Sequence, residues 1–157
     1  MLSYDFEQSL GYWVCSTAHA LRKSLDAKLS QDGITFRQWE VLALISMHGE
    51  QTQRELGERM GIEAPTLAGI LDRMERDGVV EPVPCPDERR CKRIRATDRA
   101  EALWERGVQC AHETREQAAM GLTDDELAQF KELCGKIRRN LSSEKDVSVA
   151  ASICAET

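Results

Sequence analysis

The sequence has few of the features that mark membrane-spanning or exported proteins. No apolar run in its 157 residues approaches the roughly 18–20 residues that a membrane-spanning helix needs. The first ten residues, MLSYDFEQSL, contain neither a basic start nor an apolar signal core. Aromatic residues make up only 5% of the chain and charged residues 31%. We therefore expect a cytoplasmic, mainly helical protein with much solvated helix surface.

The patterns that hold metals or carry out catalysis are also missing. The six cysteines include no C-x-x-C pair, and the three histidines do not complete a zinc-binding pattern. No phosphate-binding glycine loop is present, and no nucleophile and base stand at a useful spacing. We expect no metal, no cofactor and no enzymatic activity, with thiols that are reduced by default in a cytosol.

The charge of the chain is unevenly distributed. A formal net charge of −6 excludes a generic polycation, but phosphate binding depends on local rather than total charge. Residues 85–95 contain five basic and two acidic side chains, a local charge of +3. The length is that of one domain, which buries roughly 70% of the surface of its unfolded chain.

Long helices are predicted at both ends of the chain. Residues 6–29 carry apolar side chains at three- and four-residue steps, as on one face of a helix: Phe6, Leu10, Trp13, Val14, Ala18, Leu21, Leu25 and Leu29. A fifth helix is predicted over residues 98–119 with five inward residues: Ala100, Leu103, Trp104, Val108 and Ala111. A sixth helix follows from Thr123, which forms a capping box with Glu126. Residues 142–157 show no pattern and are expected to be a flexible tail.

Between these helices lies a helix-turn-helix pattern followed by a hairpin. Capping boxes predict helix starts at Thr35 and Thr52, and a fourth helix begins near Pro65. Its inward residues have the i, i+3, i+4, i+7 spacing: Leu67, Ile70, Leu71 and Met74. Two strands, Val79–Val83 and Arg93–Thr97, are then predicted around a charged loop, with prolines that limit the first strand to a sheet edge.

This order of elements is typical of a winged helix-turn-helix that binds duplex DNA. Thr66 on the fourth helix can bond a base or a phosphate, but Gly69 leaves the middle of that face without a side chain. Arg89 and Arg90 lie at the predicted hairpin tip, where arginine suits a narrow minor groove, and Lys92 lies behind them. The alternative is that the helices and hairpin are only packing units whose charges face solvent.

The stretch GIEAPTLAGILDRMERDGVVEPVPCPDERRCKRIRATDRAEAL resembles the MarR family of bacterial transcription regulators, and its SlyA-type members in particular. The resemblance rests on the start IEAPTL and end LDRMERDG of the fourth helix and on the wing ERRCKRIRAT, and it extends over residues 6 to about 141. This chain has Glu88 where the wing motif usually has Asp, and Gly69 where SlyA-type members tend to have Arg. Both departures bear on sequence preference.

The resemblance implies a mainly α fold with a small β-hairpin, in a single domain of residues 1–141. Residues 1–33 and 98–141 would form the base of a homodimer, and residues 35–97 would bind DNA. The target would be a near-palindromic operator. The positions that match DNA-contacting or nearby positions are Thr66, Arg73, Arg89 and Arg90.

Two kinds of switch are consistent with the residues. Family members often release DNA when a small aromatic acid binds, and the matching candidates here are Trp13, His19, Arg22, Trp39 and Trp104. The same tryptophans also fit simple core packing, since all three fall on apolar stripes. The rival switch is oxidation of Cys85 and Cys91, which flank the wing beside basic residues that lower a thiol pKa. A third hypothesis is a winged-helix protein-interaction module that has lost DNA binding.

Overall fold

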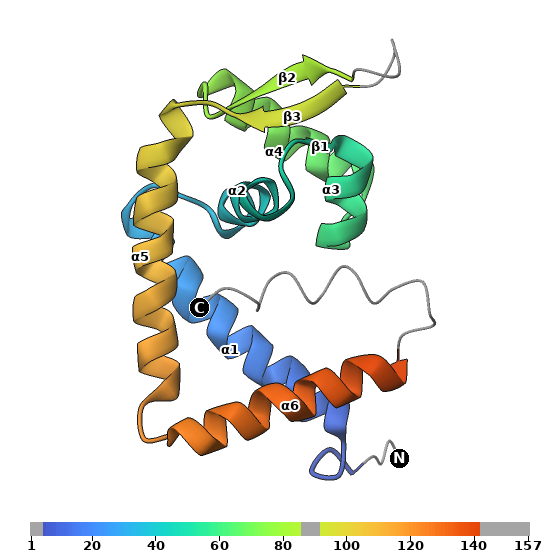
Figure 1. The fold of residues 1–157 in the computed structure, drawn as a ribbon, viewed down its shortest axis with the longest axis vertical. Helices are drawn as coiled ribbons and strands as arrows, with labels where there is room; N and C mark the ends of the chain where they lie inside the picture. Colours follow the sequence, from blue (N-terminus) through green and yellow to red (C-terminus); the bar gives the residue numbers. More distant parts are fainter. Residues whose placement is uncertain (1–4, 86–91, 142–157) are drawn as a thin grey trace.

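The fold consists of six helices and three short strands among the residues described in a computed structural model, 5–85 and 92–141. In chain order they are α1 (Leu10–Gln31), α2 (Phe36–His48), β1 (Gln51–Thr52), α3 (Gln53–Met60), α4 (Ala64–Arg76), β2 (Val80–Pro84), β3 (Lys92–Ala96), α5 (Arg99–Ala119) and α6 (Asp124–Leu141). Figure 1 shows α2, α3, α4 and the sheet gathered at one end of α5, with α1 and α6 toward its other end. We call the first group the upper lobe. No helix in the described ranges has the length and apolarity to cross a membrane.

Helix starts follow the local signals in the sequence. The Thr35 side chain accepts from the Gln38 amide while Gln38 reaches back, and Thr52 and Glu55 do the same before α3. At the start of α6, the Glu126 carboxylate accepts from both the backbone N–H and the hydroxyl of Thr123 at 2.8 and 2.9 Å. All three predicted capping boxes are confirmed, because each depends only on residues three apart.

The sheet has one more strand than the sequence predicted. Its order is β1-β3-β2, all antiparallel, so the proline-containing β2 is an edge strand as expected. The hairpin strands are Val80–Pro84 and Lys92–Ala96, each shifted by one residue from the prediction. Strand β1 was missed because it spans only two residues and runs directly into the cap of α3.

The main core lies inside the upper lobe. All four inward residues predicted for α4 are buried, and they pack with residues of α2, α3, β2 and β3. A smaller cluster joins Leu29 of α1 to Ile34 and Cys110. Burial of Leu56, Leu67 and Met74 is complete or nearly so, so the helix-turn-helix has an apolar centre of its own.

The predictions for α1 and α5 need correction. Helix α1 begins at Leu10, capped by Ser9, rather than at residue 6. Only Leu29 of its apolar stripe is buried within this chain. On α5 the buried residues are Ala100, Gly107, Cys110 and Thr114, while the other four predicted inward residues are only half-buried. On α5, Leu103 and Trp104 still pack against the main core, whereas most of the α1 stripe lies away from this chain's own core.

Candidate nucleic-acid interface

The outer face of α4 is exposed and carries the residues expected to face DNA. Gly61 ends α3 in the left-handed conformation with φ 61°, which lets the chain turn sharply into α4. Thr66, Gly69 and Arg73 are all exposed on the side opposite the core. Glu63 precedes the helix without a side-chain cap bond and Pro65 has no backbone N–H, so the N–H groups of Ala64 and Thr66 are the first of α4 that could contact a phosphate.

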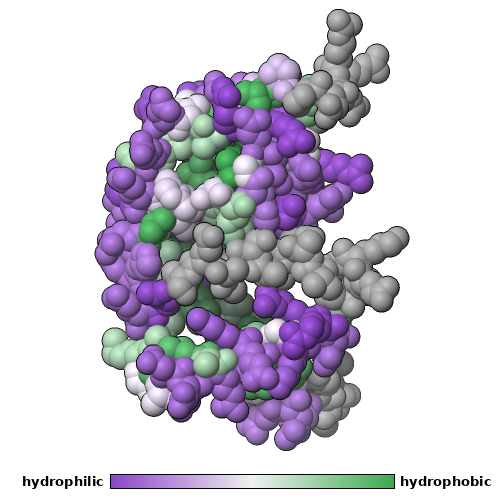
Figure 2. All heavy atoms as spheres, viewed as in Figure 1, coloured by the Kyte–Doolittle hydropathy of each residue, from purple (hydrophilic) through white to green (hydrophobic). Residues whose placement is uncertain are grey.

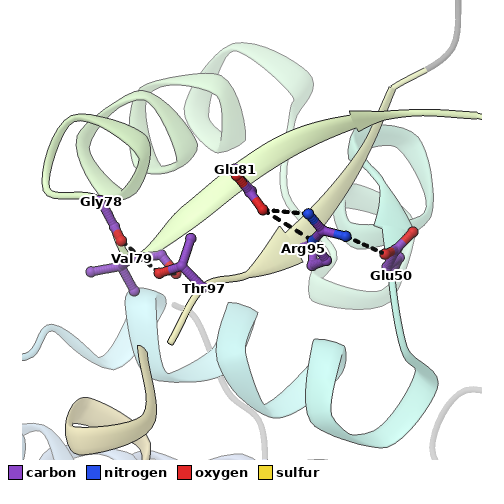
Figure 3. A network of polar contacts seen from close by, with 6 residues as sticks. All are labelled: Glu50, Gly78, Val79, Glu81, Arg95 and Thr97. Carbon is purple, nitrogen blue, oxygen red and sulfur yellow. Dashed lines mark hydrogen bonds and ion pairs between the residues drawn. The ribbon is translucent and has the colours of Figure 1, made fainter. Parts of the chain in front are cut away.

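The wing hairpin, which we define as β2 and β3, is fastened to the helix-turn-helix at its base. Thr97 Oγ1 donates to the Gly78 carbonyl at 2.6 Å, next to the end of α4. Arg95 donates to the Glu81 carboxylate through Nε and Nη2, at 3.1 and 2.6 Å, and its Nη1 lies 3.8 Å from Glu50 Oε1 (Figure 3).

The neighbouring Arg93 is also engaged within the chain, where it donates to the Glu50 carbonyl at 3.0 Å. Two of the five basic side chains counted around the wing therefore serve its base. Of the other three, Lys92 is exposed at the start of β3, and Arg89 and Arg90 lie outside the described residues. Cys85 is half-buried and takes part in a disulfide, while Cys91 is also outside the described residues.

Comparison with known proteins agrees with this architecture. A model of the MarR family matches residues 32–90. The crystal structure of transcriptional regulator PA3341 is 33% identical, with a TM-score of 0.77, over 85% of this chain and 98% of that one. The chain belongs to the MarR family. A cysteine-to-serine mutant of MarR from E. coli is 27% identical with a TM-score of 0.75, over 83% of this chain and 96% of that one.

The same E. coli mutant has also been solved in complex with operator DNA. That structure is 27% identical to this chain, with a TM-score of 0.73, over 82% of this chain and 92% of that one. These relatives are transcription regulators rather than enzymes. The helix pair α3–α4 and the adjacent hairpin of this chain thus correspond to the helix-turn-helix and wing of the MarR-family fold.

The aromatic residues suggested as an effector pocket do not gather in one place in this MarR-family chain. Trp39 and Trp104 stack on each other with ring centroids 4.7 Å apart and 17° between planes. Trp13 is 56% exposed on α1, and its indole N–H donates to the Glu7 carbonyl. Sequence spacing showed that these residues share apolar stripes, but not which helix each stripe faces.

His19 and Arg22 line a separate open cavity of about 570 Å³ between α1, α5 and the start of α2. The guanidinium carbon of Arg22 lies 4.6 Å from the centroid of the Phe36 ring, which forms another wall. Thr114 faces the same cavity and its hydroxyl is buried with no hydrogen-bond partner among the described residues. The cavity therefore offers a cation, an apolar wall and an unsatisfied polar group.

Proposed function

We propose that this chain is a homodimeric, sequence-selective DNA-binding regulator of the SlyA type that a small aromatic carboxylate releases from DNA. The observation that carries the proposal is the exposed outer face of α4 beside the fastened wing hairpin. Thr66 and Arg73 on α4 would contact the major groove, and Arg89, Arg90 and Lys92 the flanking backbone and minor groove. The E. coli relative solved with operator DNA supports this assignment.

Uncovered apolar surface supports the homodimer. Helix α6 has no buried residue. Among residues 5–85 and 92–141, eleven large apolar side chains are exposed outside the upper lobe: Phe6, Leu10, Tyr12, Trp13, Val14, Leu21, Met120, Leu122, Phe130, Leu133 and Leu141. Part of this surface is visible at the corner between α5 and α6 in Figure 2, whereas the α3 side of the upper lobe is largely hydrophilic. Extensive exposed apolar surface marks interaction sites, so we take a second copy of the chain as the partner that covers it.

The test of dimerisation is a substitution of one of these exposed apolar side chains on α6. Phe130 is 55% exposed in the single chain, so Phe130→Ser should leave the upper lobe folded while weakening self-association. Light scattering coupled to gel filtration measures the mass. A wild-type monomer, or a Phe130→Ser variant as dimeric as wild type across dilution, would contradict the proposal.

The DNA-binding test begins with selection of duplexes from a random pool. Fluorescence anisotropy on the selected duplex should show binding that weakens with salt, and Arg90→Ala should reduce the affinity and lower the salt slope by about one. Lys136→Ala is the matched control, because Lys136 is an exposed cation on α6, paired with Glu132 at 2.7 Å. Failure to select any duplex would favour the protein-interaction module instead.

The effector would occupy the cavity that His19, Arg22 and Phe36 line. Guanidinium groups bind carboxylates strongly, and the unsatisfied Thr114 hydroxyl offers a second contact. Salicylate should displace the wild-type protein from its duplex, and Arg22→Gln should bind the duplex normally but resist salicylate. Equal sensitivity of the two proteins would exclude this cavity as the effector site.

The second candidate switch is redox, and the disulfide at Cys85 favours it. If oxidation controls the protein, peroxide added after reduction of this disulfide should change DNA affinity in wild type and leave that of Cys85→Ser unaffected. Cys110 is a suitable control thiol, because burial and the nearby Asp32 carboxylate raise its pKa and so disfavour the reactive thiolate. An identical response in wild type and Cys85→Ser would remove this candidate.

A further inference from the structure

Three charged side chains form a row across the sheet at the base of the wing hairpin. Glu81 of β2 stands directly opposite Arg95 of β3 in the strand register. On the other side, Gln51 stands opposite Ile94, so the preceding residue, Glu50, falls beside Arg95. This charged row, Glu50–Arg95–Glu81, therefore crosses β2 and β3 and ends at the residue just before β1 (Figure 3). It lies on the face of the sheet opposite the buried Ile94.

The contacts within the charged row leave Arg95 poorly suited to bind a phosphate. Its Nε and Nη2 both donate to Glu81 Oε1, and its Nη1 faces Glu50 at 3.8 Å. The hydrogen bond and charge of Glu81, with a smaller effect of Glu50, raise the pKa of Arg95 above its usual value. One cation between two carboxylates carries a net negative charge, which repels rather than attracts a DNA backbone.

The segments joined by the charged row are those that must keep a fixed relation during DNA binding. β2 and β3 form the wing, whereas Glu50 belongs to the corner between α2 and β1. Thr52, the last residue of β1, is also the N-cap of α3. Only two register pairs connect β1 to β3. The ion pair between Arg95 and Glu50 therefore adds a further contact between the wing hairpin and the segment that leads into β1.

We propose that Arg95 is a positioning residue, a proposal that rests on the proposed DNA-binding function. Held between Glu81 and Glu50, Arg95 sets the angle of the wing hairpin and contacts no phosphate itself. The distance along β3 from Arg95 to Lys92 is about 10 Å, at roughly 3.3 Å per residue. A tilt of about 10° at the base therefore moves that end of the strand by about 2 Å. A shift of this size separates a hydrogen-bond donor from a phosphate oxygen.

The sign of the effect at Glu81 distinguishes positioning from direct contact. If Arg95 bound phosphate, Glu81→Gln would remove a repulsive charge and release a cation, so DNA affinity would rise. If Arg95 positions the wing, Glu81→Gln weakens the contacts that hold Arg95 and the affinity falls. Anisotropy with the selected duplex, over a series of salt concentrations, measures both the affinity and the salt slope.

We expect Arg95→Met and Glu81→Gln each to weaken binding by about tenfold while the salt slope stays that of wild type. Arg95→Lys keeps a cation between Glu81 and Glu50 and should recover most of the affinity that Arg95→Met loses. Lys136→Met, which breaks an exposed ion pair on α6, should have wild-type affinity. Thermal melts should be little changed throughout, since exposed ion pairs contribute little to folding.

Three results would overturn the proposal. One is higher affinity in Glu81→Gln, and another is a salt slope reduced by about one in Arg95→Met, which marks a lost phosphate contact. The third is wild-type affinity in Arg95→Met while Arg90→Ala binds weakly, which leaves the DNA-binding function standing and removes the role of Arg95. If the wild-type protein binds no duplex at all, the proposed function fails and this proposal fails with it.

Discussion

Gly107 is the position where a single added methyl group should do most damage. A Cβ built there would lie 2.3 Å from Trp39 Cε3 and 2.5 Å from Trp39 Cζ3, far inside van der Waals contact. The Trp39 ring has little freedom to move, because it also stacks on Trp104 with ring centroids 4.7 Å apart. Gly107→Ala must therefore displace the ring, and with it the packing of α2 against α5.

The size of the effect follows from three opposing contributions. Overpacking of a tight site costs about 1–3 kcal/mol, and loss of an aromatic stack costs about 0.5–1.5 kcal/mol. Replacing glycine by alanine inside a helix stabilises the folded protein by about 1 kcal/mol. The net expectation for Gly107→Ala is a loss of about 1–3 kcal/mol in the free energy of unfolding.

Gly69→Ala is the matched control. Gly69 also lies inside a helix, but nothing stands within 4 Å of the Cβ that alanine would add. This variant should gain up to about 1 kcal/mol. Urea unfolding followed by circular dichroism, at one fixed protein concentration because of the proposed dimer, gives both values. A Gly107→Ala protein as stable as wild type would refute the reasoning.

Three further predictions concern hydrogen bonds and pH. Glu55 accepts from the Thr52 amide and hydroxyl, which hold its pKa below the usual range. That stabilisation is complete above about pH 4.3 and is lost as the pH falls through the lower folded pKa. Thr52→Ala should lower the free energy of unfolding measured in urea by about 1 kcal/mol. It should also make that free energy depend less on pH in the acid range. Burial and then Arg59 lower the pKa of His48, so stability should fall as pH drops below about 6.5, and His48→Gln should lack that part of the fall in the same titration. Thr97→Val, which removes the 2.6 Å hydrogen bond at the end of α4, should cost about 1 kcal/mol in thermal unfolding.

Much of the upper lobe was predictable because its signals are local. A threonine and an acid or amide three residues apart define a helix start whatever the rest of the chain does, and spacing alone placed Leu67 and Met74 in the core. Strand β1 was not predictable, because a two-residue strand exists only through its pairing with β3, more than forty residues later.

The candidate site shows the same limit for charges. A count of basic residues treats Arg90 and Arg95 as equivalent, and both lie in one positive stretch of sequence. The register places Arg95 opposite Glu81 and beside Glu50, acids that lie 14 and 45 positions earlier in the chain. Charge at a nucleic-acid interface is therefore set by which acids the fold brings to each cation, and the local +3 overstates what the wing offers to DNA.

The apolar stripe of α1 poses the converse problem. Its periodicity correctly indicates one apolar face, yet Leu10 and Trp13 are more than half exposed while Leu29 on the same stripe is fully buried. Leu29 lies near the α1–α2 turn and packs with Ile34, whereas the first turns of α1 lie far from the upper lobe. The periodicity of apolar residues shows that one face of a helix must be covered. It does not show whether the same chain or another chain covers that face. The exposed end of α1 and the unburied α6 together mark where this chain's own core stops, and this is where the second copy of the proposed homodimer would pack.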